Sequence, residues 1–318
     1  MKKVLVTGAT GQIGSELTTA LREKLGMQNV IATGHKKTPD QTFLESGPFH
    51  FIDVNRIEAI AALVERYKVD TIYHLAAILS ATAEKNPQLG WHINVDGLCN
   101  VLEIARKYKC AVFTPSSIGV FGDETPKDNT PQDTIQRPST IYGITKVAGE
   151  LLCDYYFTKY GVDTRGVRYP GLISYKTPPG GGTTDYAVGI YFEAVKNKKY
   201  TCYLEPGTYL DLMYMPDALK AAIDLMTADP ERVQHRNAYN VSSMSLTPEI
   251  ITASIIKIIP DFSIDYKIDP LRQAIAESWP NRMDDRVARE EWGWTPDYDL
   301  DAMTEDMIRN ISHQCSFC

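Results

Sequence analysis

Short apolar runs alternate with stretches of helical periodicity through the first half of the chain. Runs rich in valine, isoleucine, leucine and phenylalanine predict strands at residues 3–7, 29–33, 49–53, 71–75, 111–113 and 164–169. Apolar residues three and four positions apart predict the helices between them, over residues 13–25, 57–67, 91–108 and 142–160. Strands that alternate with helices form a parallel sheet with helices on both faces. The pattern therefore predicts an α/β fold with a doubly wound parallel sheet.

Charge and composition narrow the class of protein that the 318 residues form. A net charge of -7 gives no attraction to nucleic acid or to an anionic membrane, and no apolar run reaches the length of a membrane span. The chain enters its first predicted strand directly after Met1-Lys2-Lys3, so no signal peptide is predicted. We expect a cytoplasmic protein, or a mitochondrial matrix protein if a presequence has been removed.

Six cysteines are scattered along the chain. The first four lie in strand-like or helix-like contexts and are predicted to be small buried residues of a reducing compartment. Cys315 and Cys318 have the C-x-x-C spacing of redox sites and of half a zinc site, but no second pair lies nearby in the sequence. We therefore predict an inert tail and no metal site.

Three glycines join the first predicted strand to the first helix. Gly8, Gly11 and Gly14 follow a G-x-x-G-x-x-G spacing in the run Thr7-Gly8-Ala9-Thr10-Gly11-Gln12-Ile13-Gly14. Glycines at such a junction permit a tight turn and let the backbone approach a pyrophosphate, while the helix N-terminus presents free N–H groups to it. The loop predicts a Rossmann-type dinucleotide site that includes Gln12 and Ile13.

The second predicted strand ends without an acidic residue, whereas the third ends in one. A dinucleotide site usually has an acidic residue about twenty positions past the glycines, where this chain has Gly34. Lys36 and Lys37 follow and would suit a 2′-phosphate, so NAD is our choice and NADP stays open. Asp53 ends the third strand and is predicted to accept from the adenine amino group, with helix capping as the alternative.

A tyrosine and a lysine lie four residues apart at the start of a predicted helix. Tyr142 and Lys146 share one helix face, and a nearby ammonium lowers the pKa of a phenol toward neutral pH, which makes a general base. Ser116 and Ser117 follow the strand at 111–113, at the edge of the sheet where ligands gather. We predict that Ser117 orients the substrate oxygen, with Ser116 as the alternative; both serines could instead close a turn.

The alternation of strands and helices stops after residue 170. Residues 177–184 contain two prolines and three consecutive glycines, which predicts a flexible loop or a domain crossing, and further helices are predicted over 217–226 and 249–259. We predict a dinucleotide-binding domain over 1–170, to which a segment near 210–230 returns. A smaller α/β domain over 171–318 is predicted to bind mainly the substrate.

Together these motifs resemble the extended short-chain dehydrogenase/reductases, which include the nucleotide-sugar epimerases and dehydratases. Within that family the chain is most similar to the short-chain type of L-threonine 3-dehydrogenase. The segments that carry the narrower resemblance are residues 115–122, 168–174, 180–187, 213–218, 278–280 and 285–294. The family often has threonine at the position of Ser117, so a hydroxyl is retained there.

The resemblance implies an enzyme of threonine catabolism that oxidises the C3 hydroxyl of L-threonine with NAD to 2-amino-3-oxobutyrate. It implies a homodimer, and it adds residues to both parts of the site. The further cofactor-binding residues that it implies are Leu75, Ala76, Ala77, Asn94, Lys146 and Tyr169. The substrate-binding residues are Ser80, Ser116, Ser117, Tyr142, Gly182, Thr183, Thr184 and Trp279.

Two other functions remain open from the sequence. A nucleotide-sugar epimerase or dehydratase of the same fold would need arginines for a diphosphate, and the candidates are Arg232, Arg236, Arg272 and Arg282. A non-catalytic dinucleotide-sensing protein would need no tyrosine–lysine pair, so the presence of Tyr142 and Lys146 disfavours it.

Overall fold

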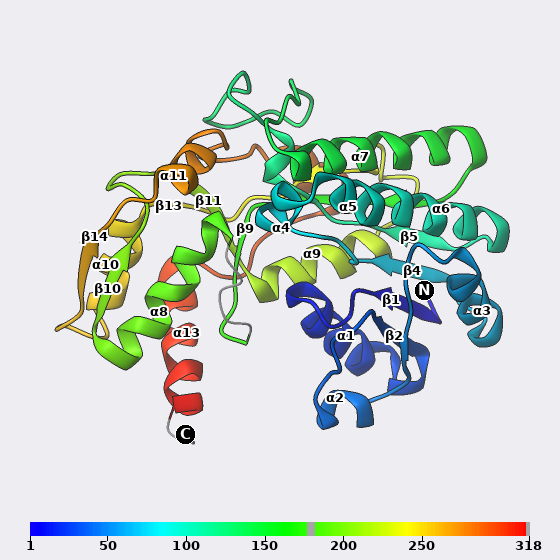
Figure 1. The fold of residues 1–318 in the computed structure, drawn as a ribbon, viewed down its shortest axis with the longest axis horizontal. Helices are drawn as coiled ribbons and strands as arrows, with labels where there is room; N and C mark the ends of the chain where they lie inside the picture. The colour runs from blue at the N-terminus through cyan, green and yellow to red at the C-terminus, as the bar shows by residue number, and fades with distance from the viewer. Residues whose placement is uncertain (177–181, 316–318) are drawn as a thin grey trace. The chain divides into compact units, whose positions relative to one another are not determined.

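The computed structural model describes residues 1–176 and 182–315 (Figure 1). Gly180 and Gly181 of the predicted loop lie outside the described residues, as do Cys318 and the side chain of Cys315. The chain forms two compact units that interleave along the sequence. The first unit comprises residues 1–120, 138–168 and 219–239, and the second comprises residues 121–137, 169–218 and 240–318.

A six-stranded parallel sheet forms the centre of the first unit, which confirms the predicted fold class. Its strand order is β3-β2-β1-β4-β5-β7, and every neighbouring pair is parallel. In that order the strands are β3 (Phe49–Phe51), β2 (Val30–Gly34), β1 (Val4–Thr7), β4 (Thr71–His74), β5 (Ala111–Phe113) and β7 (Thr164–Arg165). The order reverses between β1 and β4, so the carboxyl ends of these strands mark the edge at which an open α/β sheet binds ligands.

Helices cover this sheet on both faces. On one face α3 (Ile57–Tyr67), α6 (Gly97–Tyr108) and α7 (Ile141–Tyr160) bury apolar side chains in one core with strand residues such as Ile72 and Val112. On the other face lies α1 (Gln12–Leu25), whose Leu17 and Leu21 are fully buried. Figure 1 shows α6 and α7 on one side of the sheet and α1 on the other. These helices fix the ends of β1, β4 and β5, which carry the candidate site.

The structure divides two of the predicted elements. The predicted strand at 164–169 is broken at Gly166 into β7 and β8 (Val167–Tyr169), and β8 joins a short sheet of order β12-β8-β6 with β6 (Ser116–Ser117) and β12 (Tyr239–Asn240). A Cβ on Gly166 would lie 2.5 Å from the carbonyl oxygen of Thr114, so only glycine permits this bend. The predicted helix 91–108 starts earlier, through α5 (Pro87–Trp91) and a π-helical turn over residues 92–96. A further helix, α4 (Ser80–Lys85), occupies residues predicted as loop.

The second unit combines two small sheets with helices. One sheet has the order β13-β11-β9 and the other pairs β10 with β14. The helix α8 packs against β10 on one side and against the helices α10 and α13. The elements of this unit are β9 (Gly171–Ile173), α8 (Tyr186–Asn197), β10 (Lys199–Cys202), β11 (Leu210–Tyr214), β13 (Met244–Leu246), α10 (Pro248–Ile256), β14 (Ser263–Tyr266), α11 (Pro270–Glu277), α12 (Arg286–Trp292) and α13 (Leu300–Cys315). The segment α9 (Met215–Thr227) passes from the second unit back into the first.

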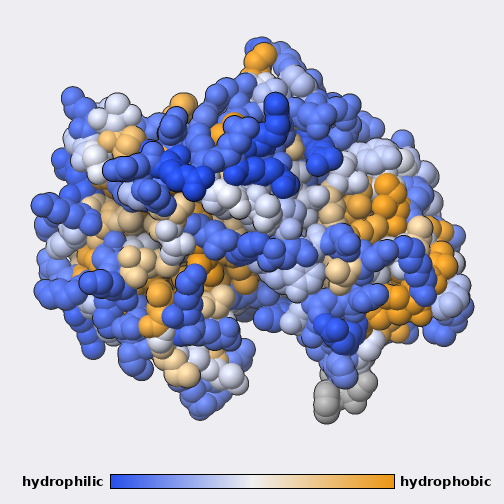
Figure 2. Space-filling model, turned by 180° about the vertical axis from the view of Figure 1, so that it is seen from behind, coloured by the Kyte–Doolittle hydropathy of each residue, from blue (hydrophilic) through white to orange (hydrophobic). Residues whose placement is uncertain are grey.

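Figure 2 shows that the face seen from behind is largely hydrophilic. Apolar side chains gather toward the right of that view, on the side of α8 and α10. Ile256 at the end of α10 and Ile258 beyond it are 39% and 42% exposed. Among the described residues, none of the helices is both long and apolar enough to cross a membrane.

A buried carboxyl group on β11 makes a first prediction about stability. Asp211 is fully buried, its Oδ2 accepts the backbone N–H of Met283 at 2.8 Å, and burial raises its pKa from 3.8 to about 7. Between these values the folded state holds a proton that the unfolded state has released, so the free energy of unfolding falls as pH rises. We expect Asp211→Asn to remove this loss and to be on the order of 1 kcal/mol more stable than wild type at pH 8. Urea denaturation of both proteins from pH 5 to pH 8 measures it, and parallel pH profiles would contradict it.

Candidate active site

Three glycines shape the turn between β1 and α1. Gly8 has a φ of 71°, and a Cβ there would lie 2.6 Å from the backbone nitrogen of Ala76. A Cβ on Gly14 would lie 2.1 Å from the carbonyl oxygen of Gly8. α1 begins after Gly11 with no side-chain cap and no acidic residue in its first turn, so the N–H groups of its first residues remain available to an anion. This cradle fits the pyrophosphate of a dinucleotide, with Gln12 and Ile13 in the first turn.

The end of β2 explains why no acidic side chain stands there. A Cβ on Gly34 would lie 2.9 Å from Cγ2 of Thr10 and 3.1 Å from Cζ of Phe49. The side chains of Thr10 and Phe49 therefore crowd this position and would have to shift to admit a larger residue. His35, Lys36 and Lys37 follow as exposed residues, and the choice between NAD and NADP stays open at this strand end.

Asp53 and Asn94 both have protein partners in the first unit. Oδ1 of Asp53 accepts the N–H of Asn55 at 3.0 Å in the turn before α3, and it does not cap that helix, whose N-cap residue is Arg56 with no side-chain cap. Oδ1 of Asn94 accepts the N–H of Ile78 at 2.7 Å, and its Nδ2 donates to the carbonyl oxygen of Ile78 at 3.0 Å and to Oγ1 of Thr145 at 3.1 Å. Asn94 thus ties the loop after β4, which contains Leu75, Ala76 and Ala77, to α7. The contacts of Asp53 and Asn94 with a cofactor stay predictions.

The predicted catalytic residues come together where β5 and β6 meet the start of α7. Ser117 of β6 hydrogen-bonds the side chain of Tyr142, and its Oγ also accepts the N–H of Gly119 at 3.1 Å. Nζ of Lys146 lies 5.7 Å from the ring centroid of Tyr142 and donates to the carbonyl oxygen of Pro115 at 2.7 Å. A phenol, a hydroxyl and an ammonium therefore lie together at the carboxyl side of β5.

The titration of Tyr142 differs from the expectation based on sequence. Burial raises the pKa of Tyr142, and the hydrogen bond with Ser117 opposes that rise only in part. The expected lowering by Lys146 is not met in this structure, because the ammonium is bound to Pro115 rather than to the phenol. Burial also lowers the pKa of Lys146 to about 8, which Glu150 opposes.

His74 at the end of β4 stays neutral beside this cluster. Burial, and next the charge of Lys146, lower its pKa to about 3. Its Nδ1 lies 2.8 Å from Oγ1 of Thr7, so the ring links the glycine turn to the neighbourhood of Lys146. A neutral ring adds no second positive charge next to the ammonium.

A close approach between two backbones sets the position of Tyr142. A Cβ on Gly143 would lie 2.2 Å from the carbonyl oxygen of Gly119, so α7 starts in direct contact with residues 118–120. Thr140 caps the helix by accepting the N–H of Gly143 at 3.1 Å. Gly143 was not among the predicted site residues, although its place between Tyr142 and Lys146 in the motif was visible.

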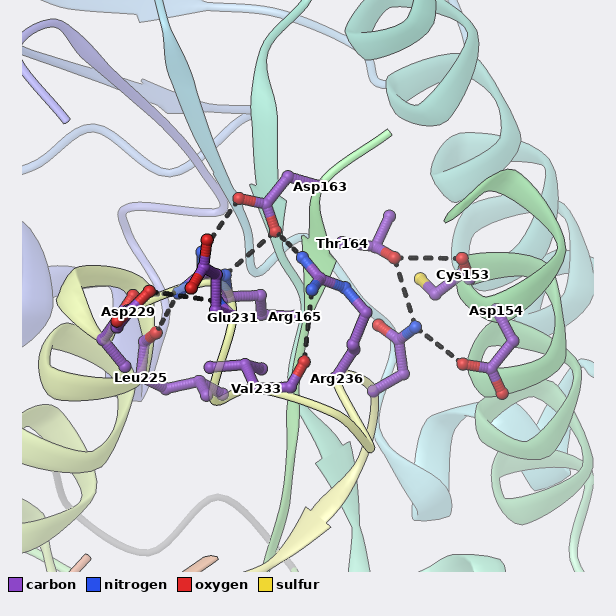
Figure 3. A network of polar contacts seen from close by, with 12 residues as sticks. Cys153, Asp154, Asp163, Thr164, Arg165, Leu225, Asp229, Glu231, Val233 and Arg236 are labelled. Atoms are coloured by element: carbon purple, nitrogen blue, oxygen red, sulfur yellow. Dashed lines mark hydrogen bonds and ion pairs between the residues drawn. The ribbon is translucent and has the colours of Figure 1, made fainter. Parts of the chain in front are cut away.

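A polar network holds residues 225–237 to β7 and α7 within the first unit (Figure 3). The carboxylate of Asp163 binds both Arg165 and Arg236, and Arg165 also donates to the carbonyl oxygens of Leu225 and Ala228. Asn237 donates to Asp154 of α7 at 2.7 Å and to Thr164 at 3.1 Å. Arg236, a candidate for binding a diphosphate, is therefore part of this network, and its guanidinium lies 4.0 Å from the ring centroid of Phe157.

Several predicted substrate residues belong to the second unit. Thr183 and Thr184 lie in a short 3-10 turn before α8, and this turn packs against α11, which Trp279 follows. The N–H of Gly182 donates to Asp185, and the hydroxyl of Tyr203 donates to the carbonyl oxygens of Gly182 and Thr183. The turn and the end of α11 are thus neighbours within this unit. Tyr169, predicted to bind cofactor, also belongs here and donates to the carbonyl oxygen of Ala218 at 2.6 Å.

Ser116 was the alternative to Ser117 for orienting a substrate oxygen, but its hydroxyl is bound to another residue of the first unit. It donates to the buried carboxylate of Glu150 on α7. Ser117, whose hydroxyl faces Tyr142, therefore remains our choice for orienting a substrate oxygen. Ser80, the first residue of α4, stays a predicted substrate contact.

A doubly covered parallel sheet with a glycine cradle and a serine–tyrosine–lysine cluster at its carboxyl edge defines a dinucleotide-binding α/β protein of the Rossmann class. Residues 4–242 match the NAD dependent epimerase/dehydratase family, and the chain belongs to that family. The predicted family resemblance is thereby confirmed.

Relatives and solved structures cover almost the whole chain. An uncharacterized epimerase/dehydratase of Staphylococcus haemolyticus is 56% identical over 314 residues, which are 99% of each chain. The structure of L-threonine dehydrogenase from Clostridium difficile has a TM-score of 0.97 and 56% identity, covering 99% of this chain and 98% of that one. A monomeric L-threonine 3-dehydrogenase from a metagenome has a TM-score of 0.92 and 47% identity, covering 98% and 99%.

Proposed function

We propose that the protein oxidises the C3 hydroxyl of L-threonine with NAD to 2-amino-3-oxobutyrate. The observation that carries the proposal is the placement of Ser117, Tyr142 and Lys146 together at the carboxyl edge of the sheet. The similarity to solved L-threonine dehydrogenases over nearly the whole chain supports threonine as the substrate.

In this reaction the residues of the chain carry out the proton transfer. The hydroxyl of Ser117 orients the oxygen at C3, and the phenolate oxygen of Tyr142 takes its proton. Lys146 favours the phenolate by its charge when its ammonium turns from Pro115 toward the phenol, which offsets the effect of burial. The bound nicotinamide would supply the two-electron acceptor, and the glycine cradle of Gly8, Gly11 and Gly14 would hold its pyrophosphate.

A turnover assay tests the proposal directly. L-threonine is supplied with NAD and, separately, with NADP, and the increase in absorbance of the reduced nicotinamide is followed. We expect turnover with NAD and formation of 2-amino-3-oxobutyrate, identified by its decarboxylation to aminoacetone. Absence of turnover with either dinucleotide at saturating L-threonine would overturn the proposal. A higher kcat/KM with NADP would instead assign Lys36 and Lys37 to a 2′-phosphate.

The nucleotide-sugar alternative is less well supported by the candidate arginines. Arg236 is engaged with Asp163, while Arg272 in the second unit lies 4.3 Å over the ring of Tyr203 and 3.7 Å from Asp269. Mass spectrometry of the purified protein for a retained sugar nucleotide distinguishes this alternative from threonine oxidation.

We also propose that the protein forms a homodimer through α7. Ile144, Leu151 and Tyr155 are 43%, 62% and 51% exposed and recur along one side of this helix. Their spacing matches the apolar stripe of a helix that packs on a partner. The metagenome relative described as monomeric makes the oligomeric state a real question.

We expect Leu151→Glu to convert the dimer to a monomer, because the introduced carboxylate would be desolvated in the paired helices. Light scattering coupled to size-exclusion chromatography measures the mass. Lys196→Glu, which adds negative charge to an exposed position of α8 instead, is the control and should leave the dimer intact. A wild-type protein that is already monomeric would contradict the proposal.

A further inference from the structure

A buried carboxylate lies on α7 one helical turn beyond Lys146 and two turns beyond Tyr142. The side chain of Glu150 is only 7% exposed. Its Oε1 accepts from the hydroxyl of Ser116 and from Nε of Arg168 at 3.0 Å, and its Oε2 accepts from Nη2 of Arg168 at 2.8 Å. A buried, doubly bound carboxylate of this kind has a fixed orientation. The proton transfer proposed above uses none of these three groups.

The residues from 115 to 117 are bound to α7 at three successive points. Lys146 binds the carbonyl oxygen of Pro115, Glu150 binds the hydroxyl of Ser116, and Tyr142 binds Ser117. The contact to Glu150 is anchored further by a charged partner, Arg168. Rotating or shifting the segment at Ser116 would move both of its neighbours relative to α7, and these neighbours contact the phenol and the ammonium.

Glu150 is also the carboxylate that faces Lys146. The other titratable groups around the ammonium are Tyr142 and Cys153 on α7 and the neutral His74 on β4, with Arg168 beyond Glu150. A cavity of about 30 Å³ adjoins these side chains, and its lining includes Lys146, Glu150, Ser116, Thr145, Asn94 and His74. Because Lys146 is half-buried among these side chains, its charge depends in part on nearby protein groups.

We propose that Glu150 is a positioning residue, which holds Ser116 and Ser117 in register on α7 and keeps the half-buried Lys146 in its ammonium form. Its catalytic consequence rests on the function proposed above; its effect on Lys146 does not. Coulomb attraction at short range in a poorly solvated site is strong enough to set a protonation state near neutral pH. Burial lowers the pKa of Lys146, and the charge of Glu150 acts against this.

The titration of Lys146 in Glu150→Gln tests the proposal without any turnover. Lysines are reductively methylated with 13C-formaldehyde, the dimethylamine signals are followed by NMR from pH 6 to pH 11, and Lys146→Arg identifies the signal of Lys146. We expect Glu150→Gln to titrate Lys146 about one pH unit lower than wild type, because the ammonium loses its counter-charge. An unchanged titration would overturn the proposal. Glu150→Asp keeps the charge and is expected to titrate near wild type.

Kinetic measurements then test the effect on register. In Glu150→Gln we expect kcat for threonine oxidation to fall roughly tenfold with little change in KM, and the loss of activity at alkaline pH to begin at lower pH. The matched control is Asp285→Asn, which removes the charge of a similarly buried carboxylate in the second unit, where Asp285 pairs with the more exposed Arg289. It should lose similar thermal stability and keep its pH profile. If both variants change kcat equally without a shift in the profile, the role of Glu150 is merely structural.

Failure of the proposed function and failure of Glu150→Gln to fold can each be distinguished from failure of the role proposed for Glu150. If wild type does not oxidise threonine, the proposed function fails, while the lysine titration still decides the role of Glu150. If Glu150→Gln does not fold because Arg168 is left unpaired, Glu150→Gln combined with Arg168→Met removes both charges together. We expect the double variant to fold and to show the same lowered titration of Lys146. A wild-type titration in the double variant would overturn the proposal.

Discussion

Tyr142→Phe is expected to reduce kcat for threonine oxidation by about 100-fold to 10,000-fold while the affinity for the dinucleotide stays within about twofold of wild type. The substitution removes only the phenolic oxygen, which the proposed reaction needs as the proton acceptor and which hydrogen-bonds Ser117. The glycine cradle at Gly8 and Gly14 is unaltered. Steady-state kinetics with L-threonine and isothermal titration with NAD measure the two quantities separately.

The control for this substitution is Tyr108→Phe. Tyr108 at the end of α6 also hydrogen-bonds through its hydroxyl, to Glu65, but it lies outside the cluster around Tyr142. It should retain the turnover of wild type. Full activity in Tyr142→Phe would show that another group takes the proton, and loss of dinucleotide affinity in the same variant would indicate that the phenol contributes to binding rather than to chemistry.

Gly14→Ala is expected to abolish measurable dinucleotide binding and to lower the free energy of unfolding by about 2 kcal/mol or more. The new Cβ would lie 2.1 Å from the carbonyl oxygen of Gly8 and 2.9 Å from Cα of Ala9. Both neighbours are backbone atoms of the turn, so the start of α1 must move away from β1. The N–H groups of its first turn would then no longer converge on a pyrophosphate. Thermal unfolding and titration with NAD measure the two losses.

Gly189→Ala is the control that tests whether the losses of dinucleotide binding and of stability are specific to the glycine turn. Gly189 lies inside α8, where a Cβ would meet only ordinary van der Waals contact with Tyr200, at 3.4 Å and beyond. Alanine is favoured over glycine within a helix by up to about 1 kcal/mol, so this variant should be as stable as wild type or more so. Normal binding of NAD by Gly14→Ala would show that the turn can open without loss of the site.

The elements that carry the chemistry were largely predictable from local sequence. The strand that ends at Gly8, the glycine spacing and the helix that presents Tyr142 and Lys146 on one face are each specified within about twenty residues. Hydrophobic periodicity predicts the order of these elements, and the alternation of strands with helices then indicates a parallel sheet. The observed order β3-β2-β1-β4-β5-β7 agrees with that inference.

Contacts between residues far apart in the sequence were not predictable in the same way. The partner that Lys146 holds is a backbone oxygen thirty-one positions earlier, and no periodicity identifies it. The spacing of Glu150 from Lys146 shows that both share a helix face, yet only the fold brings Ser116 and Arg168 to that carboxylate. Burial raises the pKa of Tyr142, and this burial depends on packing against several elements at once.

The sequence by itself determined the class of fold, the glycine turn and the identity of the phenol and the ammonium, because each follows from local spacing and side-chain chemistry. Only the tertiary structure decided where the ammonium of Lys146 is bound, that Thr10 and Phe49 crowd the position of Gly34, and that the charge of Glu150 acts on the lysine. The physical reason is that free volume and counter-charge are properties of the packed neighbourhood, and chain segments far apart in sequence make up that neighbourhood.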